Sequence, residues 1–290
     1  MANALIAKGF DVVGFDPAEE AQRWLVANGG RFGEHDQILA DCPTIVLAVV
    51  DEEQIRHILF DGKNKVRQLN SRANLLCTST VSPTFLQEIA PKVAPVSLLD
   101  APVSGGAARA LKGELAMYLS GDPQVIADVR PILSAVSSQV FEVGDSLGTA
   151  STFKLINQIL AAGNLLVASE AVALAEEAGI DLPSLSSVIG ASAGHSWMFD
   201  NVASGRIEEI KAARSAVSIF LKDIKIAQAF VAGSAVRSPT IHNAAVVLND
   251  AVNRGFGSAD AAALVSYLRG MDPELKSYNV HKGGENEREV

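Results

Sequence analysis

Apolar and polar residues follow one another over the first half of the chain in a pattern of short strands separated by helices. Six apolar runs have the length of buried strands. They are Asp11–Phe15, Thr44–Val50, Asn74–Cys77, Val96–Val103, Leu115–Ser120 and Gln139–Val143. Helical stretches lie between them, as at Ala18–Asn28, Glu52–Leu59 and Ser82–Val93. Pro17, Pro83 and Pro123 each stand where a helix can open. Alternating strands and helices predict a largely parallel sheet covered on both faces.

After Gly148 the pattern changes to helices alone. The stretch from Thr149 to Ala178 has no proline and only Gly163 as glycine, and it is apolar on nearly every side, which predicts a long buried helix. Four more helical stretches follow. They are Pro183–Ala191, Ala212–Ala232, Thr240–Arg254 and Ala259–Leu268. We therefore expect an α/β domain with a doubly wound parallel sheet over residues 1–147 and an all-helical domain over 148–272. The polar tail at 273–290 is expected to be disordered.

Composition and charge narrow the classes of function. The 290 residues are 48% hydrophobic, enough for a sizeable core, and their formal net charge is −9. A negative charge of this size disfavours nucleic acid and anionic membranes as partners. No uninterrupted apolar run reaches about 18 residues, so we expect no membrane span. Cys42 and Cys77 lie in apolar, strand-like surroundings and are expected to be reduced core thiols of a cytoplasmic protein. No metal site is expected, because the histidines and cysteines lack ligand spacing.

Two motifs carry candidate chemistry. The strand at Val96–Val103 runs into Ser104–Gly106, a turn whose backbone N–H groups can bind an anion. Some fifty residues later a helix carries Lys154, with Asn157 and Gln158 at i+3 and i+4 on the same side. Burial in an apolar helix lowers the pKa of a lysine toward the range useful for proton transfer. A plain turn and a surface lysine are the alternatives, but together the motifs predict a site for a small hydroxy acid.

These motifs have the order and spacing found in the β-hydroxyacid dehydrogenase family, which the chain resembles from about residue 1 to 271. The matching segments are Asp100–Gly106, Gly113–Gly121, Gly148–Gln158 and Phe220–Asp223. Three further segments look most like the L-threonate dehydrogenase branch: Asn157–Gln158, Leu160–Gly163 and Gly194–Phe199. The family includes 3-hydroxyisobutyrate, tartronate-semialdehyde and 6-phosphogluconate dehydrogenases. The resemblance implies an NAD(P)-dependent oxidoreductase that takes a hydride from an L-threonate-like or 3-hydroxyisobutyrate-like acid.

The resemblance also implies roles for the residues of the two motifs. Lys154 is expected to take the hydroxyl proton of the substrate as general acid/base. Ser104, Gly105 and Gly106 are expected to bind its carboxylate, and Asn157 and Gln158 to orient it. Relatives usually have asparagine where Gln158 stands, which leaves the identity of the substrate more open than the reaction type.

Further expectations concern the helical half of the chain. Lys222 matches the family lysine that approaches cofactor and substrate. Its neighbour Asp223 is expected to face elsewhere on the helix and to form a structural salt bridge. The aromatic segment of His195, Trp197 and Phe199 is expected to serve packing.

Two residues at strand ends are candidates for cofactor binding. Asp16 ends the Asp11–Phe15 strand, where Rossmann domains place an acid on the ribose hydroxyls of adenosine. A carboxylate there repels a 2′-phosphate, so NAD is favoured over NADP; a helix cap beside Pro17 is the alternative. Thr80 follows the Asn74–Cys77 strand, where the nicotinamide would lie, and a turn residue before Pro83 is its alternative.

The family pattern begins earlier than this sequence does. Relatives open with a strand and a Gly-x-Gly-x-x-Gly turn, whereas Met1 and Ala2 match the interior of the helix that follows, and Asn3–Lys8 completes it. We expect the sequence to be truncated at its start. Without that central strand its neighbours lose hydrogen bonds, and the cofactor pyrophosphate loses its binding turn.

Two alternative functions stay open at this stage. One is a non-catalytic, truncated relative that acts as a dimerising helical module. The other is an enzyme working in the opposite direction, a tartronate-semialdehyde (2-hydroxy-3-oxopropionate) reductase. In either case the long apolar helix and the resemblance imply a homodimer or homotetramer.

Overall fold

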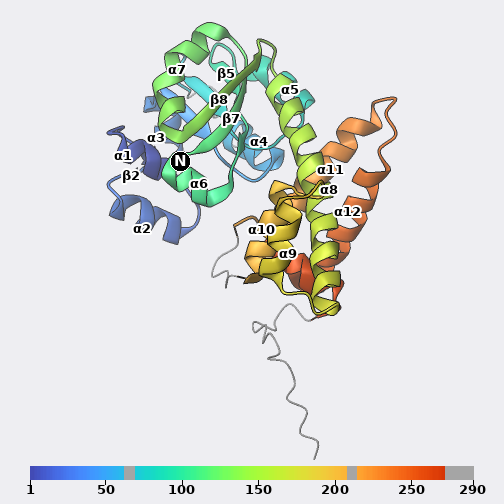
Figure 1. Ribbon diagram of the computed structural model, residues 1–290. Coiled ribbons are helices and arrows are strands. Elements are labelled where there is room, and N and C mark those ends of the chain that lie inside the picture. Colours follow the sequence, from blue (N-terminus) through green and yellow to red (C-terminus); the bar gives the residue numbers. More distant parts are fainter. Residues whose placement is uncertain (62–68, 208–213, 272–290) are drawn as a thin grey trace, which may run out of the picture. The chain divides into compact units, whose positions relative to one another are not determined.

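The computed structural model describes residues 1–61, 69–207 and 214–271 (Figure 1). The tail expected at 273–290 lies outside the described residues, as do positions 212 and 213 of the helix expected to begin there. The chain forms two compact units. The first combines Met1–Gly163 with Ile219–Val246, and the second combines Asn164–Ser218 with Val247–Val290.

A six-stranded sheet forms the centre of the first unit. Its strands are β3 (Thr44–Leu47), β4 (Asn74–Cys77), β5 (Ser97–Asp100), β6 (Val103–Ser104), β7 (Leu115–Ser120) and β8 (Ser137–Gly144). β3, β4 and β5 are parallel neighbours. β7 pairs antiparallel with β5 and β6 and parallel with β8. The prediction of a Rossmann-type α/β fold is confirmed, with a parallel sheet through β3, β4 and β5.

The start of the chain forms a separate small sheet. β1 (Val13–Gly14) pairs in parallel with β2 (Arg31–Phe32), and the helices α1 (Ala2–Ala7) and α2 (Glu19–Ala27) flank β1 in sequence. Among the strands of the described residues, none pairs with both β1 and β3. Among the described residues the two sheets therefore share no strand pairing.

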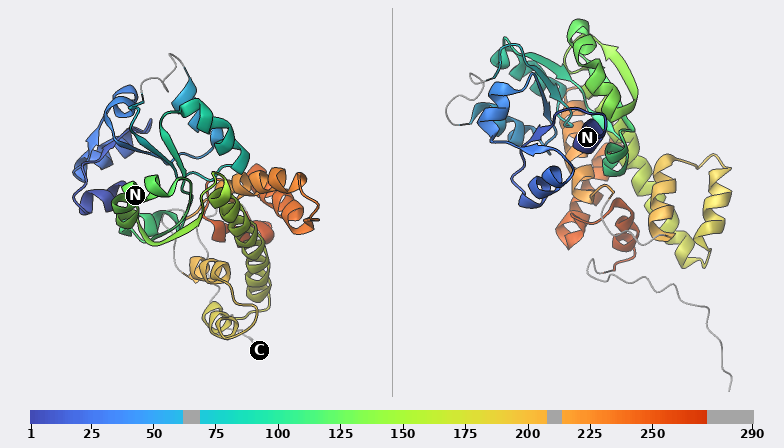
Figure 2. Two further views of the ribbon diagram at one scale, coloured as in Figure 1. Left: turned by 90° about the horizontal axis from the view of Figure 1, so that it is seen from above. Right: turned by 90° about the vertical axis from the view of Figure 1, so that its left-hand side faces the viewer.

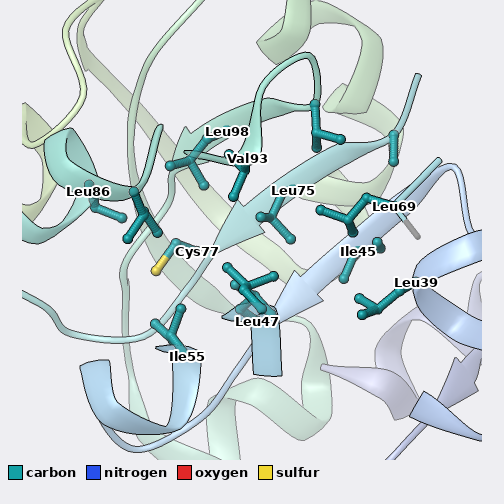
Figure 3. Close-up of a cluster of buried hydrophobic side chains, with 14 of the residues drawn as sticks. Leu39, Ile45, Leu47, Ile55, Leu69, Leu75, Cys77, Leu86, Val93 and Leu98 are labelled. Atoms are coloured by element: carbon teal, nitrogen blue, oxygen red, sulfur yellow. The ribbon is translucent and has the colours of Figure 1, made fainter. Parts of the chain in front are cut away.

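Helices cover both faces of the six-stranded sheet (Figure 2). Successive residues of a strand point to opposite sides, so a strand of apolar residues presents apolar side chains to helices on both faces. These helices are α3 (His35–Asp41), α4 (Glu52–Phe60), α5 (Pro83–Val93), α6 (Gly106–Lys112) and α7 (Pro123–Val136). Leu75 and Cys77 of β4 point into one core, together with side chains from α3, α4 and α5 (Figure 3). Leu76, between them, joins the other core with α7. β4 therefore contributes to two apolar layers, one on each face of the sheet.

Polar caps fix where two of these helices begin. Ser82 Oγ accepts a hydrogen bond from Phe85 N at 3.2 Å, and Pro83 is the first residue of α5. Asp122 accepts from the backbone N–H two residues later at 2.8 Å, and Pro123 begins α7. The prediction that these two prolines open helices is confirmed.

Beyond residue 148 the described residues are helical, which confirms the predicted all-helical second half. The helices are α8 (Thr149–Glu177), α9 (Leu182–Gly190), α10 (Trp197–Ile207), α11 (Val217–Ala232), α12 (Pro239–Ala251) and α13 (Leu264–Leu268). A π-helical turn, η2 (Val252–Phe256), and a short 3-10 helix, η3 (Ala261–Ala263), lie between α12 and α13. α10 carries the aromatic segment: Phe199 is buried as expected, but Trp197 is 63% exposed, so its packing role was predicted wrongly.

Helix α8 is not buried on all sides, contrary to the prediction. Five large apolar side chains on it are 49–66% exposed: Phe153, Ile156, Leu160, Val167 and Leu174. Their spacing of three, four, seven and seven residues places them along one side of the helix. By length and composition alone α8 meets the criteria for a membrane-crossing helix, which core helices of soluble proteins also meet. These five side chains form an exposed apolar stripe on α8.

Candidate active site

Lys154 lies in the second turn of α8 and is only 6% exposed. Its Nζ donates a hydrogen bond to Gln158 Oε1 at 2.9 Å. Burial lowers the pKa of Lys154 from 10.5 to about 8, because the charged ammonium loses its hydration. Asp223 acts in the opposite direction and raises this pKa, while Lys222 lowers it. The side chain thus has the burial and the pKa that the sequence pattern predicts.

Gln158 connects Lys154 to a second helix. Its Oε1 also accepts from Asn157 Nδ2 at 3.0 Å, and its Nε2 donates to Asp223 Oδ2 at 2.5 Å. Asp223 lies on α11 and is 3% exposed. Both polar atoms of the Gln158 amide therefore have hydrogen-bond partners. These bonds fix the orientation of the oxygen that accepts from Lys154. The expectation that Asn157 and Gln158 lie beside Lys154 is met.

Lys222 and Asp223 meet each other, although they are adjacent on α11. Lys222 Nζ lies 2.7 Å from Asp223 Oδ1, which gives the expected salt bridge. The expectation that Asp223 faces elsewhere was wrong, because its other oxygen accepts the hydrogen bond from Gln158. The long lysine side chain bends back along the helix and so overcomes the angle between neighbouring positions.

The Ser104–Gly106 turn has a backbone that favours glycine. β6 ends at Ser104 and α6 begins at Gly106. Gly105 has φ 134° and Gly106 has φ 69°, both in a region that side chains disfavour. A Cβ atom on Gly105 would lie 3.1 Å from side-chain atoms of Arg109. The first N–H groups of α6 have no side-chain cap, so they are available to an anion such as a carboxylate.

Asp100 links the strand before the Ser104–Gly106 turn to the first turn of α8. The sequence did not predict this role. It is fully buried and accepts four hydrogen bonds: from Ser120 Oγ, from Gly148 N, and from both the N and Oγ of Ser151, at 2.7–3.1 Å. Burial raises its pKa, and the donors partly oppose that rise. Asp100 ends β5 four residues before Ser104, and Ser151 precedes Lys154 by three residues. The sequence does contain a sign of this role: an aspartate at the end of an apolar strand is buried only when donors surround it.

The cofactor candidates lie at strand ends. Asp16 follows β1, and its Oδ1 accepts from Ala18 N at 2.9 Å. Ala18 is itself the N-cap residue of α2, and that helix has no side-chain cap. The bond from Ala18 therefore closes a short turn and occupies one of the two carboxylate oxygens of Asp16. Thr80 is half-buried beyond the end of β4, and its backbone carbonyl accepts from Lys222 Nζ at 3.2 Å.

A dinucleotide binds outside the carboxyl ends of parallel strands. Asp16 and Thr80 lie beyond the ends of β1 and β4, where the ribose and the nicotinamide of such a cofactor would be held.

Comparisons with known proteins identify the family of the chain. The model for the NAD binding domain of 6-phosphogluconate dehydrogenase matches residues 1–144. The model described as NAD-binding of NADP-dependent 3-hydroxyisobutyrate dehydrogenase matches residues 148–268. The chain is 31% identical to an L-threonate dehydrogenase of Haemophilus influenzae over 249 residues, which are 85% of this chain and 81% of the relative. An L-threonate dehydrogenase of Cupriavidus necator is 31% identical over 275 residues, with 94% and 93% covered.

A solved structure gives the same result. The crystal structure of a 3-hydroxyisobutyrate dehydrogenase from Salmonella typhimurium superimposes with a TM-score of 0.84 and is 32% identical in sequence. The match covers 92% of this chain and 94% of that chain. Both the sheet and the helical half are therefore shared with a dehydrogenase.

Replacing Lys154 with methionine is expected to stabilise the protein at pH 7. The folded-state pKa of about 8 lies below the ordinary value of 10.5, so between these pH values the unfolded chain binds more protons and stability rises with pH. At pH 7 the buried ammonium is therefore unfavourable by about 1–3 kcal/mol. Lys154→Met removes this unfavourable free energy. The gain in stability over the wild type becomes smaller as the pH approaches 10.

Chemical denaturation at pH 7 and pH 9.5 measures this effect. The exposed Lys112→Met variant is the matched control and should show no such pH dependence. A Lys154→Met protein that is less stable than wild type by the same amount at both pH values would show that burial does not disfavour the ammonium.

Proposed function

Because the chain belongs to the β-hydroxyacid dehydrogenase family and is an NAD(P)-dependent hydroxyacid dehydrogenase, we propose that it oxidises a small aldonate such as L-threonate. Lys154 is the general acid/base. One observation carries the proposal: a lysine amine that is 6% exposed, has a pKa of about 8 and is held by an oriented amide. An amine of this kind is neutral in a useful fraction of molecules near pH 8 and can accept a proton.

The residues of the site have separate roles in the proposed reaction: binding the substrate, accepting its proton and positioning the amine. The N–H groups at Gly105 and Gly106 and the Ser104 hydroxyl bind the substrate carboxylate. Neutral Lys154 accepts the proton of the substrate hydroxyl as the carbonyl forms. A bound nicotinamide cofactor would supply the acceptor for the hydride of the carbon that carries the hydroxyl. Gln158 keeps the amine in place, so the products are a keto acid, reduced cofactor and protonated Lys154.

The substrate assignment rests on the relatives and on the amides next to Lys154. The named relatives with 31% identity are L-threonate dehydrogenases. Asn157 and Gln158 offer amide groups to a substrate with several hydroxyls, although Gln158 is already bonded to Lys154 and Asp223. A polyhydroxy acid gains more from such groups than an acid with one hydroxyl, such as 3-hydroxyisobutyrate.

An activity panel tests the proposal. Purified protein is supplied with NAD or NADP and with L-threonate, D-glycerate, 3-hydroxyisobutyrate or 6-phosphogluconate, and reduced cofactor is followed by absorbance. The reverse reaction is tested with tartronate semialdehyde. We expect the highest kcat/KM with L-threonate. Absence of turnover on all of them, with cofactor shown to bind, would contradict the proposal, and a larger kcat/KM for tartronate semialdehyde would favour the reductase.

Loss of the Lys154 amine is expected to lower kcat by about 10²–10⁴-fold, the usual contribution of a positioned acid/base. Oxidation by the wild type should rise with pH around pH 8, because only the neutral amine accepts a proton, and Lys154→Met should lose this rise. Cofactor affinity should change little. Steady-state rates from pH 6 to 10, with Lys112→Met as control, measure both effects; a retained kcat removes the role assigned to Lys154.

Asp16 is proposed to favour NAD over NADP. Only one of its carboxylate oxygens accepts the bond from Ala18 N, and like charges repel a 2′-phosphate. Asp16→Ser should reduce the NAD-to-NADP ratio of kcat/KM by about tenfold or more. The exposed Asp128→Ser variant on α7 is the control. An unchanged ratio in Asp16→Ser would mean that this carboxylate serves only the turn before α2.

The exposed stripe of α8 is proposed to pack against a second copy of the chain. Regular spacing of large apolar side chains along one side of a helix suits pairing with an identical helix. Light scattering with size-exclusion chromatography should give a dimer or tetramer for the wild type. Leu160→Glu with Val167→Glu should shift it to monomer, whereas the exposed Leu111→Glu control on α6 should not. A monomeric wild type contradicts this assignment.

A further inference from the structure

Three oxygen atoms of the protein lie close to the ammonium group of Lys222. Lys222 Nζ donates to Val50 O at 2.8 Å and to Thr80 O at 3.2 Å. It also lies 2.7 Å from Asp223 Oδ1, as an ion pair without hydrogen-bond geometry. Lys222 is therefore linked to two backbone carbonyls and to one carboxylate.

Two of these partners belong to loops at the carboxyl ends of neighbouring parallel strands. Val50 follows β3 and Thr80 follows β4. The same loops are joined by Ser79, whose Oγ donates to Val49 O at 2.7 Å and accepts from Val49 N at 3.0 Å. Lys222 therefore adds a cationic link to a place where two loops are already held together.

The third partner leads to the reacting amine. Asp223 accepts from Gln158, and Gln158 accepts from Lys154. A continuous chain of contacts thus runs from Lys154 through Gln158 and Asp223 to Lys222. It ends on backbone carbonyls, which do not titrate.

Few charged groups act on Lys154. Asp223 and Lys222, both from α11, act on it with opposite signs, and its own helix contributes the neutral amides of Asn157 and Gln158. Cys77 on β4, on which Lys222 also acts, has its pKa raised to about 12 by burial. The carboxylate of Glu52, on α4, accepts from Ser82 N. The charge balance at Lys154 therefore depends on the pair formed by Lys222 and Asp223.

We propose that Lys222 is a positioning residue, which neutralises Asp223 and holds the β3 and β4 loops, and so sets the charge state of Lys154. The inference rests on the proposed role of Lys154 as general acid/base. With Lys222 in place, the carboxylate of Asp223 is paired and stabilises the Lys154 ammonium only weakly. Without Lys222, the unpaired carboxylate holds Lys154 in its protonated form, which cannot accept the substrate proton.

Opposite substitutions are expected to move the pH profile of oxidation in opposite directions. Lys222→Met raises the pKa of Lys154 and should move the rise of kcat to higher pH by about one unit, so that kcat at pH 7 falls about tenfold. Asp223→Asn removes the group that raises this pKa and should move the rise to lower pH. Lys222→Arg keeps the charge and should restore most of the wild-type profile. A purely structural role of Lys222 gives loss of activity without these shifts.

A second readout does not depend on turnover. In protein labelled with ¹³C-lysine, the Cε signal of Lys154, assigned by its loss in Lys154→Met, reports the titration of the amine directly. The titration midpoint should rise in Lys222→Met and fall in Asp223→Asn, and Lys225→Met, exposed on the same helix, should leave it unchanged.

Two outcomes overturn the inference. One is an unchanged Lys154 midpoint in both Lys222→Met and Asp223→Asn. The other is a large rise of the cofactor KM in Lys222→Met with no shift of the pH profile, which means that Lys222 contacts the cofactor. If Lys222→Met does not fold, Asp223→Asn alone tests the inference: a lower titration midpoint of Lys154 supports it, and an unchanged or higher midpoint contradicts it. Failure of the proposed function looks different: Lys154→Met retains kcat, while the coupling of the two lysines is still visible by NMR.

Discussion

The burial of a single amine constrains the rest of the site. A lysine ammonium that leaves water loses several kcal/mol of hydration free energy, and Lys154 is 6% exposed. The chain does not compensate this loss with a direct carboxylate partner, because Lys154 donates to the neutral amide of Gln158. A direct ion pair would restore the ordinary pKa and keep the amine charged. Placing one amide between the lysine and Asp223 keeps the pKa at about 8 and yet leaves the amine hydrogen-bonded.

Two charged groups help to hold the amine in place. Asp100 accepts four hydrogen bonds and attaches the first turn of α8 to the ends of β5 and β7. Lys222 pairs with Asp223 and donates to the loops after β3 and β4. Both groups therefore fix the geometry around Lys154. The glycine turn and Lys154 are thereby held to the same sheet.

Regular patterns made most of the fold predictable from sequence. The strands Asn74–Cys77 and Leu115–Ser120 match β4 and β7, since a continuous apolar run between turn residues has few alternatives. Thr44–Val50 was predicted too long, because Val49 bonds to Ser79 beyond the end of β3. α3 and α10 were missed, as short helices have weak periodicity. The exposed stripe of α8 escaped notice because a helix that is apolar all round does not reveal which side the chain covers.

The site could be predicted only in part. Local motifs placed Lys154, Asn157 and Gln158 together, because residues three and four apart on a helix are neighbours. The contacts of Lys222 were not predictable, since its carbonyl partners lie 172 and 142 residues away in sequence. Asp100 was visible as a polar residue at the end of an apolar strand, but its donors come from two separate segments, the end of β7 and the start of α8.

The central claim is that a neutral Lys154 amine receives the hydroxyl proton of an acid anchored at Gly105 and Gly106. A crystal structure with a hydroxy acid and the cofactor tests it most directly. The account predicts the hydroxyl oxygen about 3 Å from Lys154 Nζ and the carboxylate on the N–H groups of the glycine turn. A substrate whose carboxylate lies on Lys154, or whose hydroxyl lies beyond hydrogen-bond reach of that amine, would contradict it.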